Sequence, residues 1–399
     1  METNWAGNIT YRAASVQRPR TLDELREIVS RAPRVRVVGS RHSFTRIGDS
    51  DALVSLAALP PDVTVDGDAV TCGGGMTYAA LARSLDGLAL HNLASLPHIS
   101  VAGTIATATH GSGVTNGNLA TAVAALELVT SDGEIVRLAR GEADFAGAVV
   151  SLGALGAVTR MTLDVEPAYE VRQRVFEGLS WDALLGHFDE VVSAAYSVSV
   201  FTRWGETTDM VWLKERGEPR AQLFDARPAT VERHPILGLE AIRATAQLGV
   251  PGPWYDRLPH FKIEFTPSNG EEIQSEYFVA RTDAVAAIRA VREIAGRLRD
   301  ALQVTEIRTI AADELWLSPQ YRQDTVGLHF TWIRDQEAVE RALAPLEEAL
   351  APFGARPHWG KAFLALPEYE RLADFAALRE RLDPRGAFRN RWLDRLLGG

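Results

Sequence analysis

The chain has 399 residues, more than one hydrophobic core usually supports, so two domains are the default expectation. Hydrophobic residues make up 46% and charged residues 24%, which excludes an extensively disordered protein. The net charge of -10 argues against nucleic acid or an anionic membrane as the main partner.

Cysteine content and hydropathy indicate the compartment. Cys72 is the single cysteine, which excludes an intramolecular disulfide and a multi-cysteine metal site and permits a reducing compartment. The first residues show neither a basic nor an apolar leader, and no run of about eighteen apolar residues occurs. We therefore expect a soluble, unexported, cytoplasmic protein.

The first part of the chain alternates short strands and helices. A capping box at 21–24 precedes apolar residues at helical spacing and a strand at 35–38. The next predicted elements are strands at 52–56, 63–65 and 70–72, a short helix through 81–85, a hairpin of 122–130 and 134–138, a helix at 145–152 and a strand at 158–165. The glycines at 73–75 lack the spacing of a Rossmann fingerprint, and Pro167 marks a domain boundary.

From about residue 171 the pattern changes to alternating strands. They are predicted at 198–204, 210–214, 261–265, 273–280, 304–310 and 326–333. Helices with apolar stripes are predicted at 283–302 and 336–350. This order is typical of an antiparallel sheet with helices on one face, so the fold class is α+β. Residues 219–259, rich in Pro and Gly, are the least structured part and are expected to cover a site entrance.

Two stretches of small residues are candidates for binding a polar ligand. His42 lies in a loop with Gly39, Ser40 and Ser43, whose backbone a phosphate can approach, although a loop histidine is more often only structural. In 103–113, nine of eleven residues are Gly, Ala, Ser or Thr, which suits wrapping an extended ligand. A flexible linker is the alternative, but flanking strand patterns favour an ordered loop.

Charged residues also recur at strand spacing. A period of two places Glu306 and Arg308 on one face, and likewise His329 and Thr331, although a solvated ion pair is the ordinary alternative. In 358–363, alternation would place Lys361 beside aromatic rings, which would lower its pKa unless the ammonium reaches water. Neither metal-ligand spacing nor a Gly-x-Ser-x-Gly elbow is found, so we predict no metal site and no serine hydrolase.

Two motifs carry a resemblance to a known family: Gly-Ser-Arg-His-Ser-Phe at 39–44 and Ser-Leu-Pro-His-Ile-Ser-Val-Ala-Gly-Thr-Ile-Ala-Thr-Ala-Thr-His-Gly-Ser-Gly at 95–113. They resemble the vanillyl-alcohol-oxidase-type flavoproteins, specifically the alditol oxidases and their aldonolactone-oxidase relatives. The resemblance spans nearly the whole chain and includes residues 4–8, 306–308, 358–361 and 383–390.

The resemblance implies a two-domain α+β flavoprotein. Residues 1–168 would form an FAD-binding domain of the PCMH type, 169–365 a substrate-binding cap domain, and 366–399 a segment returning to the first domain. FAD would be attached covalently through its 8α position to His42. The implied cofactor contacts are Val37, Val38, Gly39, Ser40, Arg41, His42, Ser43, Ser95, Ser100, Gly103, Thr107, Ala108, Thr109, His110 and Val158.

One position departs from the relatives. Arg41 stands where they often have glycine, so a positive φ there would strain the arginine by about 1 kcal/mol or more. Alternatively the turn accommodates arginine, and its guanidinium faces the cofactor or solvent.

The implied reaction is oxidation of the terminal hydroxyl of an alditol such as xylitol or sorbitol to the aldose. Hydride would pass to flavin N5, and oxygen would be reduced to hydrogen peroxide. Lys361, Arg308 and Glu306 would be catalytic, and the implied substrate contacts are Ser95, Glu306, Arg308, His329, Thr331 and Lys361. The partners are therefore a small polyol and oxygen, without nucleic acid, membrane or metal, and we expect a monomer.

Two alternatives remain at this level. An aldonolactone oxidase or dehydrogenase would keep FAD but change the substrate, and a carrier protein could replace oxygen. A flavin- or sugar-binding protein without turnover would use the same charged residues only to hold a ligand.

Overall fold

The first part of the chain is built on small sheets. The computed structural model describes residues 2–265 and 271–398. A three-stranded sheet joins β1 (Val16–Gln17), β3 (Leu53–Val54) and β2 (Arg36–Val37). A five-stranded antiparallel sheet has the order β4 (Thr64–Asp66), β5 (Ala69–Gly73), β9 (Ala157–Asp164), β7 (Val123–Val129) and β8 (Ile135–Ala139). The helices of this part are α1 (Leu22–Arg31), α2 (Tyr78–Ser84), α3 (Val101–Ala106) and α4 (Phe145–Val149).

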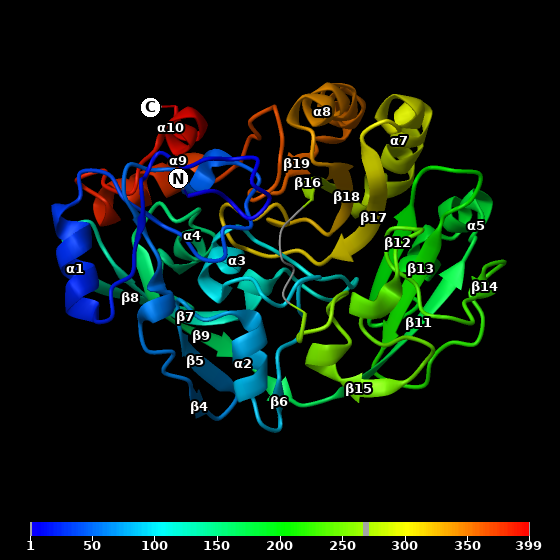
Figure 1. Cartoon of the computed structure of the whole chain (residues 1–399), viewed down its shortest axis with the longest axis horizontal. Helices are drawn as coiled ribbons and strands as arrows, with labels where there is room; N and C mark the ends of the chain where they lie inside the picture. Colours follow the sequence, from blue (N-terminus) through cyan, green and yellow to red (C-terminus); the bar gives the residue numbers. More distant parts are fainter. Residues whose placement is uncertain (1, 266–270, 399) are drawn as a thin grey trace.

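The second part is built on one large antiparallel sheet. Its order is β14 (Arg227–Pro228), β11 (Glu170–Glu177), β13 (Met210–Glu215), β12 (Ser197–Thr202), β17 (Leu302–Ile310), β18 (Thr325–Ile333), β16 (Glu272–Ala280) and β19 (Arg356–Pro357), with β15 (Pro251–Pro253) on β11. Between the two parts β6 (Leu88–Ala89) pairs with β10 (Glu166–Pro167). The helices of this part are α5 (Trp181–Gly186), α6 (Phe188–Val192), α7 (Ala284–Leu298) and α8 (Gln336–Leu350). Figure 1 shows α7 and α8 together on one side of the large sheet.

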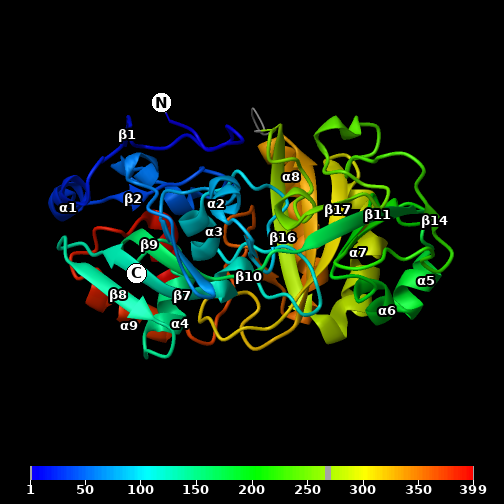
Figure 2. The same cartoon turned by 90° about the horizontal axis from the view of Figure 1, so that it is seen from below.

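The C-terminal residues pack back on the first part. They form α9 (Leu372–Leu382), which contacts α4, and α10 (Arg391–Leu397), which contacts a 3₁₀ turn at Arg46–Gly48. The N–H of Val35 also donates to the carbonyl of Ala387 at 2.8 Å. Figure 2 shows α9 beside α4 and β8. The remaining 3₁₀ turns are Leu56–Ala58, Leu119–Ala122, Ala241–Arg243, Trp254–Asp256, Arg281–Asp283 and Ala351–Phe353.

Local signals in the sequence explain several of these elements. The hydroxyl of Thr21 accepts from the N–H of Glu24 at 3.2 Å, and the Glu24 carboxylate accepts from the N–H of Arg20 at 2.7 Å, so the capping interaction that begins α1 is confirmed. Along β17, Ile307 faces the core beneath α7 and α8, whereas its neighbours Glu306 and Arg308 face the opposite side. The predicted α+β class, with an antiparallel sheet covered by helices on one face, is confirmed.

Three predicted elements differ from those in the structure. Residues 261–265 form no strand beyond one bridge between Phe261 and Ala244. The small-residue stretch begins inside the helix α3, whose Val101 and Ile105 pack into the core. Leu302 begins β17 and does not end a helix. No helix among residues 2–265 and 271–398 has the length and apolarity needed to cross a membrane.

Candidate active site

A cavity of about 680 Å³ lies between the two parts of the chain. Most of the predicted site residues line it: Val37, Val38, Gly39, Ser40, Arg41, His42, Ser43, Ser95, Ser100, Gly103, Thr107, Thr109, His110, Glu306, Arg308, His329, Thr331 and Lys361. Ala108 and Val158 lie outside this lining, Ala108 in the core and Val158 in β9. The segment expected to cover the entrance contributes His234, Pro235, Ile236, Leu239 and Arg243 to the wall.

The two small-residue stretches meet along one wall of this cavity. The N–H of Ser100 donates to the hydroxyl of Ser40 at 3.3 Å. A Cβ atom at Gly39 would overlap with the hydroxyl of Ser100, so only glycine permits this approach. The resulting wall carries little side-chain bulk and several polar groups, which fits the extended, phosphate-containing form of FAD.

His42 lies in this wall beneath the N-terminal segment. The rings of His42 and Trp5 are 4.1 Å apart between centroids. Burial lowers the pKa of His42 to about 3, and the charge of Lys361 acts in the same direction. His42 is therefore a neutral imidazole at physiological pH, with a nitrogen lone pair available for bonding.

Arg41 adopts the left-handed backbone conformation that is expected where relatives have glycine. Its φ is 58°, so an L-residue stands where glycine is favoured. The carbonyl of Arg41 accepts from the N–H of Trp5 at 2.9 Å, and its guanidinium pairs with Glu2. These contacts hold the strained residue to the N-terminal segment that covers His42.

Glu306 and Arg308 project together into the cavity, as strand alternation predicted. The Arg308 Nε lies 3.5 Å from Glu306 Oε1, and Nη1 donates to the hydroxyl of Ser95 at 3.4 Å. Burial disfavours the charge of Glu306, but Arg308 and His260 hold its pKa well below the ordinary value. Ser95, Arg308 and Glu306 thus offer a donor and acceptor set that matches neighbouring hydroxyls.

Glu276 stands at the centre of the charged cluster, and the sequence prediction missed it. Its fully buried carboxylate lies 2.7 Å from Arg308 Nη2 and 2.7 Å from Lys361 Nζ. These cations outweigh the effect of burial and hold the pKa of Glu276 well below its usual range. Glu272, Gln274 and Glu276 recur at a period of two in β16, which is the same spacing that identified the Glu306 face.

Lys361 reaches this cluster from a turn, so the predicted strand alternation is wrong here. Its N–H donates to the carbonyl of His358 at 3.0 Å, and Trp359 is directed away to pack on Tyr369. Burial lowers the pKa of Lys361, as predicted, but the surroundings are Glu276 and His329 and not aromatic rings.

His329 receives the second hydrogen bond of Lys361. Lys361 Nζ lies 2.6 Å from His329 Nδ1, and His329 Nε2 lies 3.2 Å from the hydroxyl of Thr331. Burial and the charge of Lys361 lower the pKa of His329 to about 4, so the ring is neutral and Nδ1 accepts. One N–H of the Lys361 ammonium remains for a ligand in the cavity.

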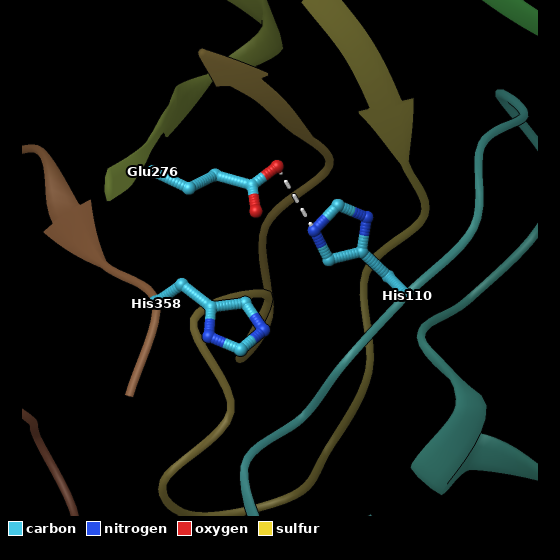
Figure 3. A group of neighbouring side chains, drawn as sticks. All are labelled: His110, Glu276 and His358. Atoms are coloured by element: carbon cyan, nitrogen blue, oxygen red, sulfur yellow. Dashed lines mark ion pairs between the residues drawn. The ribbon is translucent and has the colours of Figure 1, made fainter. Parts of the chain in front are cut away.

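His110, Glu276 and His358 point toward one another and have the residue types of a metal site (Figure 3). The chemistry of the group argues against a cation. His358 Nδ1 accepts from the N–H of Gly360 at 3.0 Å, so the neutral ring carries its hydrogen on Nε2 and has no lone pair there for a metal. Arg308 and Lys361 already neutralise Glu276, and a further cation would be repelled.

Comparisons with known proteins identify the family of the chain. Residues 13–139 match the family model "FAD binding domain", and residues 266–396 match "D-arabinono-1,4-lactone oxidase". The chain is 52% identical to an alditol oxidase from Streptomyces sp. (strain IKD472 / FERM P-14339), covering 100% of this chain and 99% of the relative. It is 30% identical to an L-gulono-1,4-lactone dehydrogenase from Mycobacterium tuberculosis, covering 99% of each chain.

Solved structures share the fold. The crystal structure of a cholesterol oxidase from B. sterolicum superposes with a TM-score of 0.78 at 15% identity, covering 99% of this chain and 96% of that one. A solvent-stable cholesterol oxidase gives a TM-score of 0.80 at 15% identity with the same coverage. At these identities the similarity concerns the arrangement of the two parts and not their substrates.

Proposed function

Because the chain belongs to the alditol oxidase family and contains an FAD-binding domain, we propose that it oxidises the terminal hydroxyl of an alditol such as xylitol or sorbitol to the aldose. One observation supports this most. Glu306, Arg308 and Lys361 project into the same cavity as the small-residue wall with His42. A cofactor on that wall would lie next to groups suited to several hydroxyls of one ligand.

FAD would be held by the wall formed by 39–43 and 100–110, and covalently by His42. The neutral state of His42 supports the linkage, since a protonated imidazole has no free lone pair. Bound FAD would accept the hydride from the carbinol carbon and pass the electrons to oxygen, giving hydrogen peroxide.

The charges around the cavity favour a substrate oxygen that becomes negative. Lys361 and Arg308 contact the carboxylates Glu276 and Glu306, and burial keeps the nearby histidines neutral. Both cations also line the cavity, where they can face a substrate oxygen. Their attraction for a developing alkoxide would lower the barrier for hydride loss.

Each chain residue has a separate part in this proposal. Lys361 and Arg308 donate to the reacting oxygen and stabilise the developing alkoxide. Its proton would pass to Lys361 while a Lys361 proton moves to the neutral Nδ1 of His329, and with the hydride this proton balances the hydrogen peroxide formed. Glu306 accepts from the neighbouring hydroxyl, which fixes the orientation of the carbon chain. Ser95, through a hydroxyl that both donates and accepts, binds a third position.

Anaerobic addition of xylitol to the purified yellow protein tests the proposal. Bleaching of the flavin followed by recovery with air is expected. Xylitol, sorbitol and galactonolactone should then be compared with and without oxygen. Reduction by the lactone alone, or transfer only to a carrier protein, would support the lactone alternative that the match over 266–396 raises. An unbleached flavin with every compound would indicate a binding protein.

We also propose that the protein acts as a cytoplasmic monomer. Its single cysteine is buried, so neither a disulfide nor an oxidising compartment is required. Light scattering of the purified holoenzyme gives the mass directly, and a dimer would contradict the monomer.

A further inference from the structure

A buried lysine stands behind the cavity and is connected to it by one histidine. Lys214 lies in β13 with 1% exposure and takes no part in the cavity wall. Its ammonium donates to the carbonyls of Leu258 and Pro259, the latter at 3.0 Å, and lies 3.1 Å from Nδ1 of His260. On the other side of the ring, His260 Nε2 lies 2.8 Å from Glu306 Oε1.

The protonation states follow from what each atom can do. The ionised carboxylate of Glu306 only accepts hydrogen bonds, so His260 Nε2 must carry the hydrogen. Nδ1 of the neutral imidazole then carries a lone pair and accepts a hydrogen bond, so the group next to it must be a hydrogen-bond donor. Lys214 is that donor, and its three N–H groups match three acceptors.

We propose that Lys214 and His260 are positioning residues that fix the carboxylate of Glu306 for the substrate hydroxyl. Lys214 selects the imidazole tautomer, and the tautomer presents a donor to one oxygen of Glu306. The other oxygen is left to accept from the ligand. This inference rests on the proposed oxidation of a polyol.

The same segment also holds Ser95, another residue of the cavity wall. The N–H groups of His260 and Phe261 both donate to the carbonyl of Ser95, at 3.0 and 3.3 Å. The hydroxyl of Ser95 in turn accepts from Arg308. A shift of His260 would therefore move Glu306 and Ser95 together, and small displacements of positioning groups have large kinetic effects.

Burial acts on both groups, and it keeps His260 neutral while it disfavours the charge of Lys214. It lowers the pKa of His260 to about 4, so the ring stays neutral at physiological pH. It lowers the pKa of Lys214 to about 7, which the charge of Glu306 partly opposes. The ring of His260 packs against Phe201 and Trp212, at 5.6 and 5.3 Å between centroids, so it has little freedom to turn.

The first test compares two substitutions at one position. In His260→Gln the amide can still donate to Glu306, whereas in His260→Leu it cannot. With saturating and limiting xylitol under anaerobic conditions, we expect His260→Leu to weaken binding and slow flavin reduction by about 10- to 100-fold. His260→Gln should keep most of the parental rate. Equal rates for both variants and the parent would overturn the proposal.

The second test asks whether Lys214 acts through the histidine. Lys214→Met should slow reduction about as much as His260→Leu, and the double variant should be no slower than the slower single variant. Additive losses would show that Lys214 acts independently, as a purely structural lysine would, and would overturn the relay. Flavin content and unfolding temperature identify the variants that are folded.

A third measurement is independent of activity. Histidine ¹⁵N spectra of the oxidised holoenzyme, with His260 assigned through His260→Gln, should show the Nε2–H tautomer. The Nδ1–H tautomer in the parent would contradict the inference even if Lys214→Met does not fold. Failure of xylitol to reduce the parental flavin would overturn the proposed function instead, and the tautomer would still decide the relay.

Discussion

Replacing Lys361 by methionine removes an ammonium that contacts both Glu276 and His329 while keeping a similar side-chain length. An ammonium about 3 Å from an alkoxide contributes a gross attraction of ~5 kcal/mol at an effective dielectric constant of about 20. Arg308 remains to share that charge, so the loss should match removal of one preorganised donor, about 2.7–4 kcal/mol. We therefore expect flavin reduction to slow by roughly 100- to 1,000-fold.

Anaerobic stopped-flow with saturating xylitol measures this step without the oxygen reaction. Lys361→Met should retain its covalent flavin, because Glu276 still pairs with Arg308 and the cluster stays partly neutralised. Lys262→Met is the matched control, since the Lys262 ammonium donates to the carbonyl of Ile242 at 3.1 Å and, among the residues that the structure describes, Lys262 is not part of the cavity lining. A Lys361→Met enzyme that reduces its flavin at the parental rate would remove Lys361 from the mechanism.

Four further outcomes are expected. Acid-precipitated parental protein should stay yellow, whereas His42→Ala should release its flavin into the supernatant; a colourless parental precipitate contradicts the linkage. Ala94 is small and lines the cavity, so we expect oxygen to reach the flavin past this residue. Ala94→Val should then slow reoxidation by oxygen more than reduction by xylitol, and stopped-flow traces with the opposite order would reject an oxygen path beside Ala94. Glu276→Gln removes the carboxylate that pairs with the buried cations Arg308 and Lys361, so it should lower the free energy of unfolding by roughly 3–5 kcal/mol. An unchanged denaturant midpoint would show that Glu276 does not neutralise these cations. The pKa values of His260 and His329 are about 4 in the folded protein and about 6.5 in the unfolded chain. As the pH falls, the unfolded chain therefore takes up protons before the folded protein does, so the free energy of unfolding should decrease from pH 6.5 toward 4. A constant unfolding temperature over this pH range would contradict the lowered pKa values.

Much of the site follows from local rules that act over a few residues. The period of two along a strand places Glu306 with Arg308 and His329 with Thr331, and both pairs line the cavity. The same rule applied to 358–363 gave the wrong neighbours for Lys361, because the chain turns there and is not extended. The lowered pKa of Lys361 was correct only because burial acts whatever the surrounding groups are.

The sequence by itself determined the fold class, the family and the residues of each polar face. These properties depend on spacing along the chain, on capping residues and on motifs that are continuous in sequence. The tertiary structure decided which of these polar faces contact one another. Glu276 contacts Lys361 across 85 positions of sequence, and the Lys214, His260 and Glu306 contacts depend on strand order and on the path of an irregular segment. No local pattern encodes those separations, because they are set by how the sheet and the loops pack against each other.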